Sequence, residues 1–394
     1  MCGSVVHVVV VVIVDHQIVA TRQREEDSKA VTTASDGLAR GGWRGADAWA
    51  DPGLVRIMGW KSLLYSVVKN TGYVVAGLCS VAVGLLYVFQ DKLLYHPVLP
   101  GMERSNRHNP RGMKSPREHG IAFEDLRIET EDGLKIHAWL MRPAAGQEAR
   151  ATVLYFHGNA GNIGFRLPNA KQMVEILRVN VLLVEYRGYG DSDDARPSET
   201  GFMRDARAAL KQMLSREDID PARIITFGRS IGGAVALSLA HDSGPGRGGI
   251  AAVIVENTFL SIGKMVDTIF PALVPLKPLV LRLRWNSEAI IDRVEQPILF
   301  INGARDELVP PSHSHQLHKQ AAAARFKELY IIPNGSHNDT WQKGGRAYYA
   351  KLDSFIQKCF GEDAGMSQDF STSGAQRIPI MPRSTAGLAA SALQ

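Results

Sequence analysis

The sequence has little cysteine, with three residues in 394. Cys2, Cys79 and Cys359 lie far apart, and Cys79 falls inside an apolar stretch. A disulfide scaffold or a Cys/His metal site needs clustered ligands at short spacings, which this sequence does not offer. We therefore expect no disulfide framework and no metal centre.

The sequence also lacks a strong charge of either sign. Lys and Arg number 45 against 40 Asp and Glu, which gives a net charge of +5. The basic residues are scattered and form no stripe with interleaved aromatic residues, so the sequence predicts no nucleic-acid partner. With 45% hydrophobic and 22% charged residues, the composition excludes a wholly disordered or fibrous chain.

Long apolar runs are scarce, with one exception. Residues 73–89 carry no charge, and residues 63–68 add apolar turns before Lys69. Together they can reach across a bilayer core of about 30 Å, so residues 63–89 are predicted to form a transmembrane signal-anchor helix. The alternative is a buried core helix, which the fold predicted below does not need ahead of its first strand.

The two ends of the chain show no sustained periodicity of apolar residues. Residues 1–57 are predicted to be a disordered or non-native extension, and the run Val8 to Val14 inside them is too short to span a bilayer. One hypothesis is that translation starts at Met58. Residues 361–394, rich in Ser, Gly and Ala, are predicted to be a disordered tail.

The orientation of the predicted membrane helix is weakly specified. Basic residues lie at comparable distances on both sides, so the positive-inside rule gives little bias, and a type II orientation is only slightly preferred. Two sequons, Asn334-Gly335-Ser336 and Asn338-Asp339-Thr340, flank His337. A glycan on either would crowd that histidine, so the sequons are unused or argue for a cytosolic domain.

Residues 118–360 alternate between short apolar runs and helical patterns. Apolar and polar residues alternate on both sides of Glu131-Asp132-Gly133, which predicts a β-hairpin from Leu126 to Met141. Further strands are predicted at 152–156, 181–186, 223–227, 252–255, 298–301 and 329–332. Helices are predicted between them at about 168–178, 199–215, 231–241, 311–324 and 341–358. This rhythm is typical of a mostly parallel sheet flanked by helices, the α/β class.

The motif Gly228-Arg229-Ser230-Ile231-Gly232 is weak by itself, but its setting is specific. It follows a predicted strand directly and opens a helical run of small residues, which is the arrangement of a nucleophile elbow. Small residues are needed because the strained turn packs the helix closely against the strand. Ser230 is therefore the predicted nucleophile.

A serine hydroxyl needs a base, and the base needs an orienting acid. In an elbow fold the partners follow in the order Ser, Asp, His, which points to Asp306 and His337 in the loops after the last two strands. Glu256 and Glu307 are alternatives for the acid. The other histidines are placed less well: His157 lies in a separate loop, His241 closes the helix after the serine, and His313 and His315 lie on a helix expected to be exposed.

The loop after strand 152–156 contains His157, Gly158 and Asn159. Its position is the one from which a second oxyanion amide comes, so the backbone amides of Asn159 and Ile231 are predicted to form the oxyanion hole. His157 and Gly158 shape the turn, and these two residues and Tyr186 are candidates for substrate contact. A phosphate-binding loop is excluded because no Gly-Lys-Ser/Thr sequence ends the motif.

Several motifs are similar to those of the Bem46-like branch of the α/β-hydrolases. They are Phe89-Gln90-Asp91, Leu93-Leu94-Tyr95, Tyr155 to Asn162, Gly228-Arg229-Ser230, Val255 to Ser261 and His337 to Trp341. The resemblance covers about residues 74–360. It implies an α/β-hydrolase fold, a charge relay of Ser230, Asp306 and His337, a single-pass signal anchor and, for nearer cousins, removal of palmitoyl groups from protein cysteines.

The predicted reaction is acyl transfer through an acyl-enzyme, which requires no cofactor. Residues 258–294 are apolar and are a candidate for a short cap, and such a cap beside a membrane anchor favours an acylated protein or lipid as substrate. The alternative is that these residues only pack on the sheet. A serine peptidase and a non-catalytic membrane scaffold are the rival functions.

Overall fold

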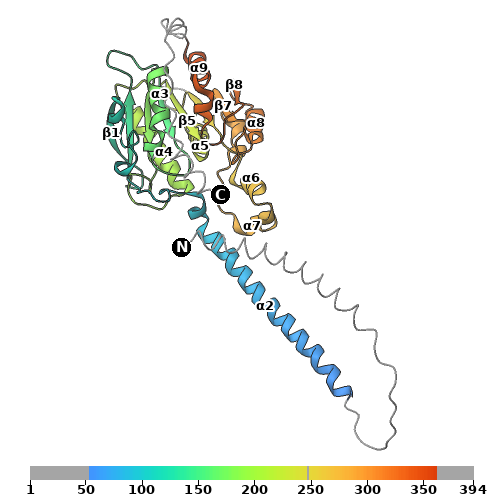
Figure 1. Ribbon diagram of the computed structural model, residues 1–394. Coiled ribbons are helices and arrows are strands. Elements are labelled where there is room, and N and C mark those ends of the chain that lie inside the picture. Colours follow the sequence, from blue (N-terminus) through green and yellow to red (C-terminus); the bar gives the residue numbers. More distant parts are fainter. Residues whose placement is uncertain (1–52, 246–247, 362–394) are drawn as a thin grey trace, which may run out of the picture. The chain divides into compact units, whose positions relative to one another are not determined.

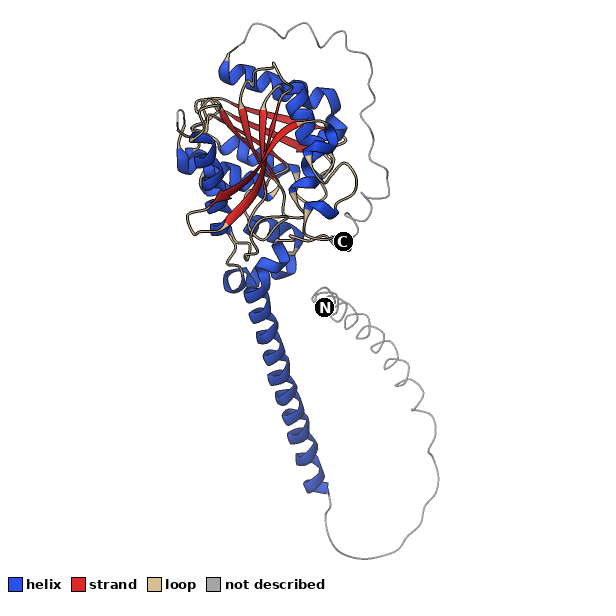
Figure 2. Cartoon of the chain, turned by 90° about the vertical axis from the view of Figure 1, so that its left-hand side faces the viewer, coloured by secondary structure: helices blue, strands red, loops and turns tan. Residues whose placement is uncertain are grey.

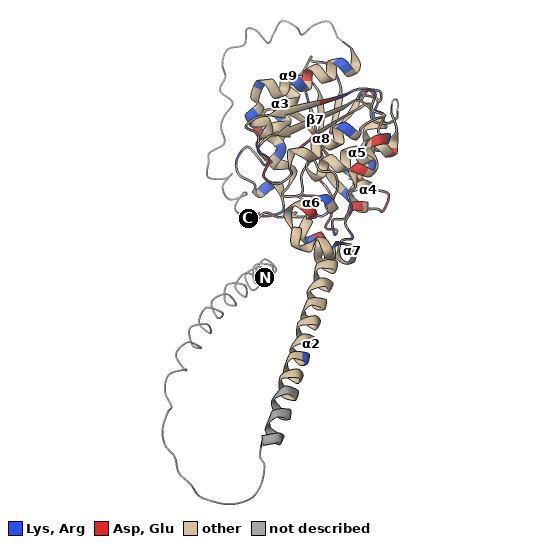
Figure 3. Ribbon diagram, turned by 90° about the vertical axis from the view of Figure 1, so that its right-hand side faces the viewer, with Lys and Arg blue, Asp and Glu red and all other residues tan. Residues whose placement is uncertain are grey.

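The computed structural model describes residues 53–245 and 248–361. The predicted N-terminal extension lies outside them except for residues 53–57, which begin helix α2 (Gly53–Leu94), and the predicted tail lies outside them after Gly361. Within α2, the span Ser62–Leu94 is long and apolar enough to cross a membrane, and its most apolar stretch is not buried by protein. In Figure 3 this helix carries few charged residues.

The centre of the molecule is an eight-stranded sheet with the order β1-β2-β4-β3-β5-β6-β7-β8. The pairs β1–β2 and β2–β4 are antiparallel, and all later pairs are parallel. The strands are β1 (Ala122–Glu129), β2 (Lys135–Arg142), β3 (Thr152–Phe156), β4 (Asn180–Val184), β5 (Ile224–Arg229), β6 (Ala252–Glu256), β7 (Ile298–Gly303) and β8 (Lys327–Ile332). The predicted α/β fold with a mostly parallel sheet is confirmed.

Helices cover both faces of this sheet (Figures 1 and 2). The helices α3 (Leu167–Leu177) and α9 (Thr340–Phe360) share one apolar core with the sheet, and α4 (Glu199–Leu214), α5 (Ile231–Ser243) and α8 (Pro311–Gln320) share the other. Strands β3 to β6 are buried along their whole length, as strands covered on both faces must be.

The predicted elements differ from the observed ones mainly at their ends. Strand β1 begins at Ala122, before the alternating stretch from Leu126, because its first residues pair with the end of β2, where Ala122 faces Arg142. Helix α8 ends at Gln320 and not near residue 324. The remaining segments are short helices: η1 (Asn106–His108), η2 (Pro116–His119), η3 (Ile163–Arg166), α6 (Ile262–Ile269), η4 (Pro271–Leu276), α7 (Lys277–Val280), η5 (Ser287–Ala289) and η6 (Ile291–Arg293).

The strand order places a topological switch point beside β5. From β3 the chain crosses to β4 on one side, and it then returns past β3 to β5 on the other side. The helices α3 and α5, which follow β3 and β5, lie on opposite faces, so the loops after these two strands diverge at the carboxyl edge of the sheet. Ligands of open α/β sheets bind at such a switch point. Ser230 follows β5 directly and therefore lies there.

Candidate active site

Ser230 occupies a strained turn between β5 and α5. Its φ of 55° and ψ of −122° are rare for a residue with a side chain. The turn is fixed by two hydrogen bonds, in which the Ser230 amide donates to the Glu256 carbonyl and the Thr258 hydroxyl donates to the Ser230 carbonyl. Backbone strain of this kind persists only when the surroundings enforce it, and it gathers at functional sites.

The glycines around Ser230 are required by close packing. A Cβ atom on Gly228 would lie 2.0 Å from the Gly232 carbonyl oxygen, and one on Gly232 would lie 2.1 Å from the Phe156 carbonyl oxygen. A Cβ on Gly233 would lie 2.5 Å from the Thr258 side chain. Only glycine lets α5 approach β3 and β5 this closely, so the sequence motif has a direct steric cause.

His337 and Asp306 meet at the same edge of the sheet. The Nδ1 atom of His337 lies 2.9 Å from Oδ2 of Asp306, and both side chains are almost fully buried. The other carboxylate oxygen of Asp306 accepts the backbone amides of Leu308 and Val309 at 2.9 and 2.8 Å. These bonds hold the carboxylate still, so it fixes the tautomer of His337 with Nδ1 protonated and leaves Nε2 as the acceptor.

The two alternative acids are engaged elsewhere. Glu256 accepts the Tyr348 hydroxyl at 2.6 Å and lies 3.4 Å from Nε of Arg229, while burial raises the pKa of its carboxyl. Glu307 accepts the backbone amide of His337 at 3.2 Å, so it contacts the loop and not the imidazole. Of these three carboxylates, Asp306 is the one that contacts the His337 ring.

The loop that carries His337 is hydrogen-bonded to residues close to the nucleophile turn. Arg229, the residue before Ser230, donates from Nη2 to the His337 carbonyl at 2.6 Å. Asn257 donates to the same carbonyl at 3.0 Å and to the Thr340 hydroxyl at 2.9 Å. The described hydrogen bonds do not include one between the Ser230 hydroxyl and His337, and such contacts are commonly long before substrate binds.

The loop after β3 faces Ser230. A Cβ atom on Gly158 would lie 3.7 Å from Cβ of Ser230, so the two turns are in contact. Within the described residues, the backbone amides of Asn159 and Ile231 donate to no protein acceptor. Two free amides on adjoining turns, one of them at the start of α5, match the requirement of an oxyanion hole.

Asn159 is also the point at which the end of α2 attaches to the site. Its side chain donates to the Leu94 carbonyl at 2.9 Å, and its own carbonyl accepts the His96 amide at 2.9 Å. The Tyr189 hydroxyl donates to the same carbonyl at 2.7 Å. The chain that leaves the apolar helix therefore holds the loop that carries the candidate oxyanion amide.

Comparisons with known proteins show the family of the chain. A protein of Arabidopsis thaliana described as α/β-hydrolase domain-containing protein WAV2 is 38% identical over 300 residues, which cover 73% of this chain and 92% of the relative. Protein bem46 of Schizosaccharomyces pombe is 33% identical over 75% of this chain and 95% of its own length. The chain belongs to the Bem46-like family of α/β-hydrolases.

Other matches of this Bem46-like chain are consistent with that placement. Residues 147–290 match the family model described as serine aminopeptidase, S33. An esterase of Pyrococcus furiosus shares the fold at a TM-score of 0.53 and 18% identity, with 68% of this chain and 98% of the esterase covered. At this identity the esterase shows the fold alone, and the family model is consistent with the α/β-hydrolase family of the chain.

The membrane helix has support from a relative as well. An uncharacterized membrane protein of Saccharomyces cerevisiae is 33% identical over 71% of the Bem46-like chain and 93% of its own length. Together with the long apolar helix α2, this likeness indicates a single-pass membrane anchor.

His157 and Tyr186 lie deeper than the sequence suggested. Both are fully buried, with Tyr186 stacked on Phe202 at 3.8 Å between ring centroids, so neither presents a surface to substrate. The Tyr186 hydroxyl instead donates to the His157 carbonyl at 3.1 Å. Of the three predicted substrate contacts, only Gly158 lies against Ser230, and the other two support the loop from behind.

Behind this loop lies a buried pair of titratable groups. Nδ1 of His157 donates to the Gly158 carbonyl at 2.7 Å, and its Nε2 lies 3.5 Å from Oε1 of Glu185 with no other partner for either atom. Burial lowers the pKa of His157 to about 3 and raises the pKa of Glu185 to about 7. With Nδ1 of His157 donating, its Nε2 is an acceptor that faces the Glu185 carboxyl, and the raised pKa of Glu185 favours the protonated acid beside a neutral imidazole.

His313 also differs from its prediction. It is 5% exposed, not on an open helix face, because α8 packs on β7 and turns this ring inward, where Nδ1 accepts the Leu260 amide at 3.3 Å. His315, two residues on, is exposed as predicted. Neither ring contacts Asp306 in the manner of His337.

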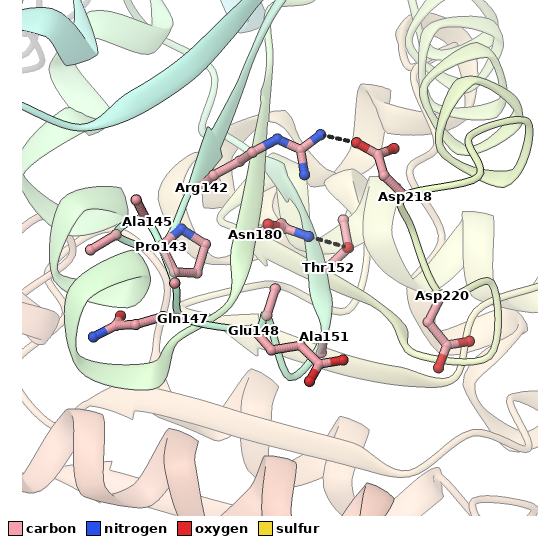
Figure 4. Close-up of a pocket in the computed structure, with 13 residues that line it drawn as sticks. Arg142, Pro143, Ala145, Gln147, Glu148, Ala151, Thr152, Asn180, Asp218 and Asp220 are labelled. Atoms are coloured by element: carbon pink, nitrogen blue, oxygen red, sulfur yellow. Dashed lines mark hydrogen bonds and ion pairs between the residues drawn. The ribbon is translucent and has the colours of Figure 1, made fainter.

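A cavity of about 300 Å³ lies at the opposite edge of the sheet. It is formed where β2 ends and where β3 and β4 begin, and its lining contains neither Ser230 nor His337. Figure 4 shows Arg142 paired with Asp218 and Asn180 bonded to Thr152 on its walls. No nucleophile with a base lies among these lining residues, so the cavity is not the candidate active site.

Proposed function

We propose that this Bem46-like protein is a membrane-anchored serine hydrolase that cleaves long-chain acyl esters or thioesters, including palmitoyl groups on protein cysteines. His337 accepts the Ser230 proton as the hydroxyl attacks the acyl carbonyl, and the amides of Asn159 and Ile231 hold the oxyanion. The protonated His337 then gives its proton to the leaving alcohol or thiol. Water, activated by the same histidine, releases the acid and restores Ser230.

The observation that carries the proposal is the bond of 2.9 Å between His337 and Asp306, at the sheet edge where Ser230 occupies its strained turn. A nucleophile on an elbow, an oriented imidazole and two free amides are the parts that acyl transfer needs. The mechanism calls for no metal or organic cofactor, and within the described residues no group of His, Cys, Asp and Glu is arranged to hold a metal ion.

The substrate class follows from the contact between the site and the end of the membrane helix. The loop with Asn159 is bonded to the end of α2, so the reacting carbonyl would sit within a few residues of the bilayer boundary. Fatty-acyl chains partition into bilayers at about 0.8 kcal/mol for each buried CH₂, which concentrates such substrates at that boundary. A membrane-bound acylated protein or lipid therefore fits this site better than a soluble short ester.

A peptidase is the second candidate, because the family model that matches residues 147–290 is described as a serine aminopeptidase. An aminopeptidase needs an anion to bind the free amino group of its substrate. The buried carboxylates of Glu256 and Asp306 are bonded to protein groups already. Glu307 is exposed and accepts one backbone amide, so it is the carboxylate near the site that an aminoacyl substrate would use.

The experiment is a substrate panel with the full chain in lipid nanodiscs. Thioesters and esters of short, medium and palmitoyl length are compared with aminoacyl amides, with the variant Ser230→Ala as the blank. We expect hydrolysis that rises with acyl length and disappears in the variant. Faster cleavage of the amides would favour the peptidase, and no cleavage of any substrate would favour a non-catalytic membrane scaffold.

A further inference from the structure

The segment from α6 to α7 exposes large apolar side chains that a water-soluble surface would normally bury. Ile269, Phe270, Val274, Leu276 and Leu279 are 40, 53, 38, 37 and 70% exposed. They fall within twelve residues of chain, interrupted by prolines that confine the backbone to short helices. Contiguous apolar surface of this kind marks a binding face.

The length of the segment limits what that face can bind. Pro271–Val280 is an apolar stretch of 10 residues, too short to cross a bilayer. A stretch of this length is a core helix, a re-entrant segment or an interfacial segment. Its exposure excludes the core helix, because none of the residues of η4 and α7 is buried.

The segment is bonded directly to the end of the membrane helix. The Gln90 side chain donates to the Val280 carbonyl at 3.0 Å, and its oxygen accepts the amides of Arg282 and Leu283 at 2.9 and 3.0 Å. Arg282 also pairs with Asp91. In Figures 1 and 3, α7 lies beside this end of α2. The apolar face of the segment is therefore continuous with the last turns of the span.

Helix α2 keeps its apolar character up to this contact. Tyr87, Val88 and Phe89 just before the contact at Gln90, and Leu93 just after it, are between 37 and 53% exposed. A helix that still presents apolar side chains at its last turns leaves the bilayer at that level. The side chains of the segment, tied to the same turns, lie at the same depth.

Exposed basic residues lie on the elements that adjoin the apolar face. Lys92 on α2, Lys264 on α6 and Arg284 after α7 are exposed. Amphipathic segments that lie in the plane of a bilayer combine apolar side chains with Lys and Arg, which reach the anionic headgroups. This charge pattern matches a lipid surface.

We propose that the segment Ile262–Val280 is a second membrane contact, which lies in the bilayer interface beside α2 and inserts Phe270 and Leu279 below the headgroups. With α2 it holds the carboxyl edge of the sheet toward the bilayer. Thr258, four residues before α6, is bonded to the Ser230 carbonyl, so the chain that leads into the segment starts from the nucleophile turn. On the proposed function, on which this second part rests, the acyl chain reaches Ser230 from the bilayer without passing through water.

Depth measurements test the membrane contact without reference to activity. The native cysteines are replaced by serine, and an environment-sensitive fluorophore is attached to a single cysteine in Phe270→Cys, Leu279→Cys or the control Gln147→Cys. Gln147 is exposed and lies at the opposite edge of the sheet. The full chain is placed in nanodiscs that contain lipids with a nitroxide at the headgroup or along the acyl chain.

An interfacial segment sits about 5–10 Å into the headgroup and acyl boundary. We therefore expect quenching at positions 270 and 279 to exceed that at 147 several-fold, with the shallow acyl nitroxide most effective. Equal quenching at all three positions would overturn the proposal. A fluorophore shielded from water at 270 and 279 but not quenched by lipid would show that a second copy or another protein covers the face, which would also overturn it.

An activity arm separates this proposal from the proposed function. The variant Phe270→Ser/Leu279→Ser should lose several-fold of its rate on a palmitoyl thioester in the bilayer and keep its rate on a short water-soluble ester. Insertion without hydrolysis of either substrate would sink the proposed function and leave the membrane contact standing. Equal rates of variant and wild type on both substrates would contradict delivery from the bilayer.

Discussion

The two edges of the parallel sheet differ in how their polar groups are held. At the carboxyl edge, Ser230, Asp306 and His337 are at most 8% exposed, and their loops are joined by hydrogen bonds from Arg229 and Asn257. At the amino edge a cavity of about 300 Å³ is lined by polar residues such as Glu148 and Asp220, which are exposed to water. The cavity and the candidate catalytic residues therefore lie at opposite edges of the sheet.

This difference shows what to look for in an α/β fold of unknown activity. Volume alone selects the amino edge, where charged side chains such as Glu148 and Asp220 are solvated. A strained backbone and buried, hydrogen-bonded polar groups indicate the carboxyl edge. Both features cost folding free energy, so they persist where the surroundings enforce them and they gather at functional sites. The strand order gives the same answer, since the switch point lies beside β5.

The largest effect is expected from the base. Removing a catalytic histidine from a serine hydrolase lowers kcat by about 10⁶-fold, so we expect a loss of this order in His337→Ala. The matched control is His315→Ala, because His315 is an exposed histidine on α8. Initial rates on a palmitoyl thioester measure both variants. A His337→Ala enzyme with normal turnover would remove His337 from the mechanism.

The acid should contribute less than the base. In Asp306→Asn the amide keeps the shape of the side chain but favours the wrong tautomer of His337, and we expect kcat to fall by about 10⁴-fold. Asp220→Asn, a carboxylate change at the amino edge, should leave kcat unchanged. Comparable losses of kcat in Asp306→Asn and Asp220→Asn would show that the carboxyl edge matters no more for catalysis than the amino edge.

The hydrogen bond from Arg229 to the His337 carbonyl should affect turnover through the position of the imidazole, and it should have little effect on substrate binding. A displacement of about 1 Å in a catalytic group costs about 100-fold in rate, so Arg229→Met/Glu256→Gln should lower kcat by about 10- to 100-fold with little change in KM. The second substitution removes the buried carboxylate that Arg229 would otherwise leave unpaired. Glu256→Gln alone is the control, and a rate as low as that of the double variant would show that Arg229 does not position His337.

Glu185 should make stability depend on pH. Burial raises the pKa of its carboxyl from 4.5 to about 7, so the folded state binds the proton more tightly than the unfolded state. Its contribution is fully present below about pH 4.5 and falls by about 3 kcal/mol as pH rises through the folded pKa near 7. His157 contributes with the opposite sign over part of this range, because its lowered pKa makes the folded state bind fewer protons than the unfolded state. Thermal unfolding of wild type and Glu185→Gln at pH 5 and pH 8 therefore isolates the Glu185 contribution as the difference between the two proteins. The stability of wild type relative to the variant should fall between pH 5 and pH 8, and a difference that is the same at both pH values would show that Glu185 is not the group responsible.

The smallest effect is expected at the cavity of the amino edge. Gln147→Trp places an indole among its walls, and because Gln147 is exposed we expect less than about 0.5 kcal/mol of change in stability and no change in kcat/KM. The same rate measurements apply. A large fall in kcat/KM would mean that substrate uses this cavity, and the assignment of the two edges would have to be reversed.

The fold was predictable because each of its elements has a local pattern. Buried runs such as Thr152 to Phe156 mark strands on the sequence, and the small residues around Ser230 mark the elbow through steric need. The partners of Ser230 followed from their order along the chain. The structure adds the contact that distinguishes Asp306 from Glu256.

The bonds between distant segments were not predictable. Arg229 and His337 are 108 residues apart, and nothing in either motif indicates that one side chain holds the carbonyl of the other. The burial of Tyr186 and His313 depends in the same way on helices that arrive from elsewhere in the chain. The apolar segment before Arg282 was visible on the sequence, but its exposure was not, because a buried cap and a membrane contact have the same composition.

Active-site labelling tests the central claim most directly. The full chain in nanodiscs is treated with a fluorophosphonate, which reacts with activated serines, and the modified peptide is identified by mass spectrometry. An adduct on Ser230 is expected in the wild type, with no adduct in Ser230→Ala and normal labelling in Ser238→Ala, a serine on the same helix. A wild-type protein that remains unlabelled, or that is labelled at another serine, would contradict the assignment of Ser230 as the nucleophile.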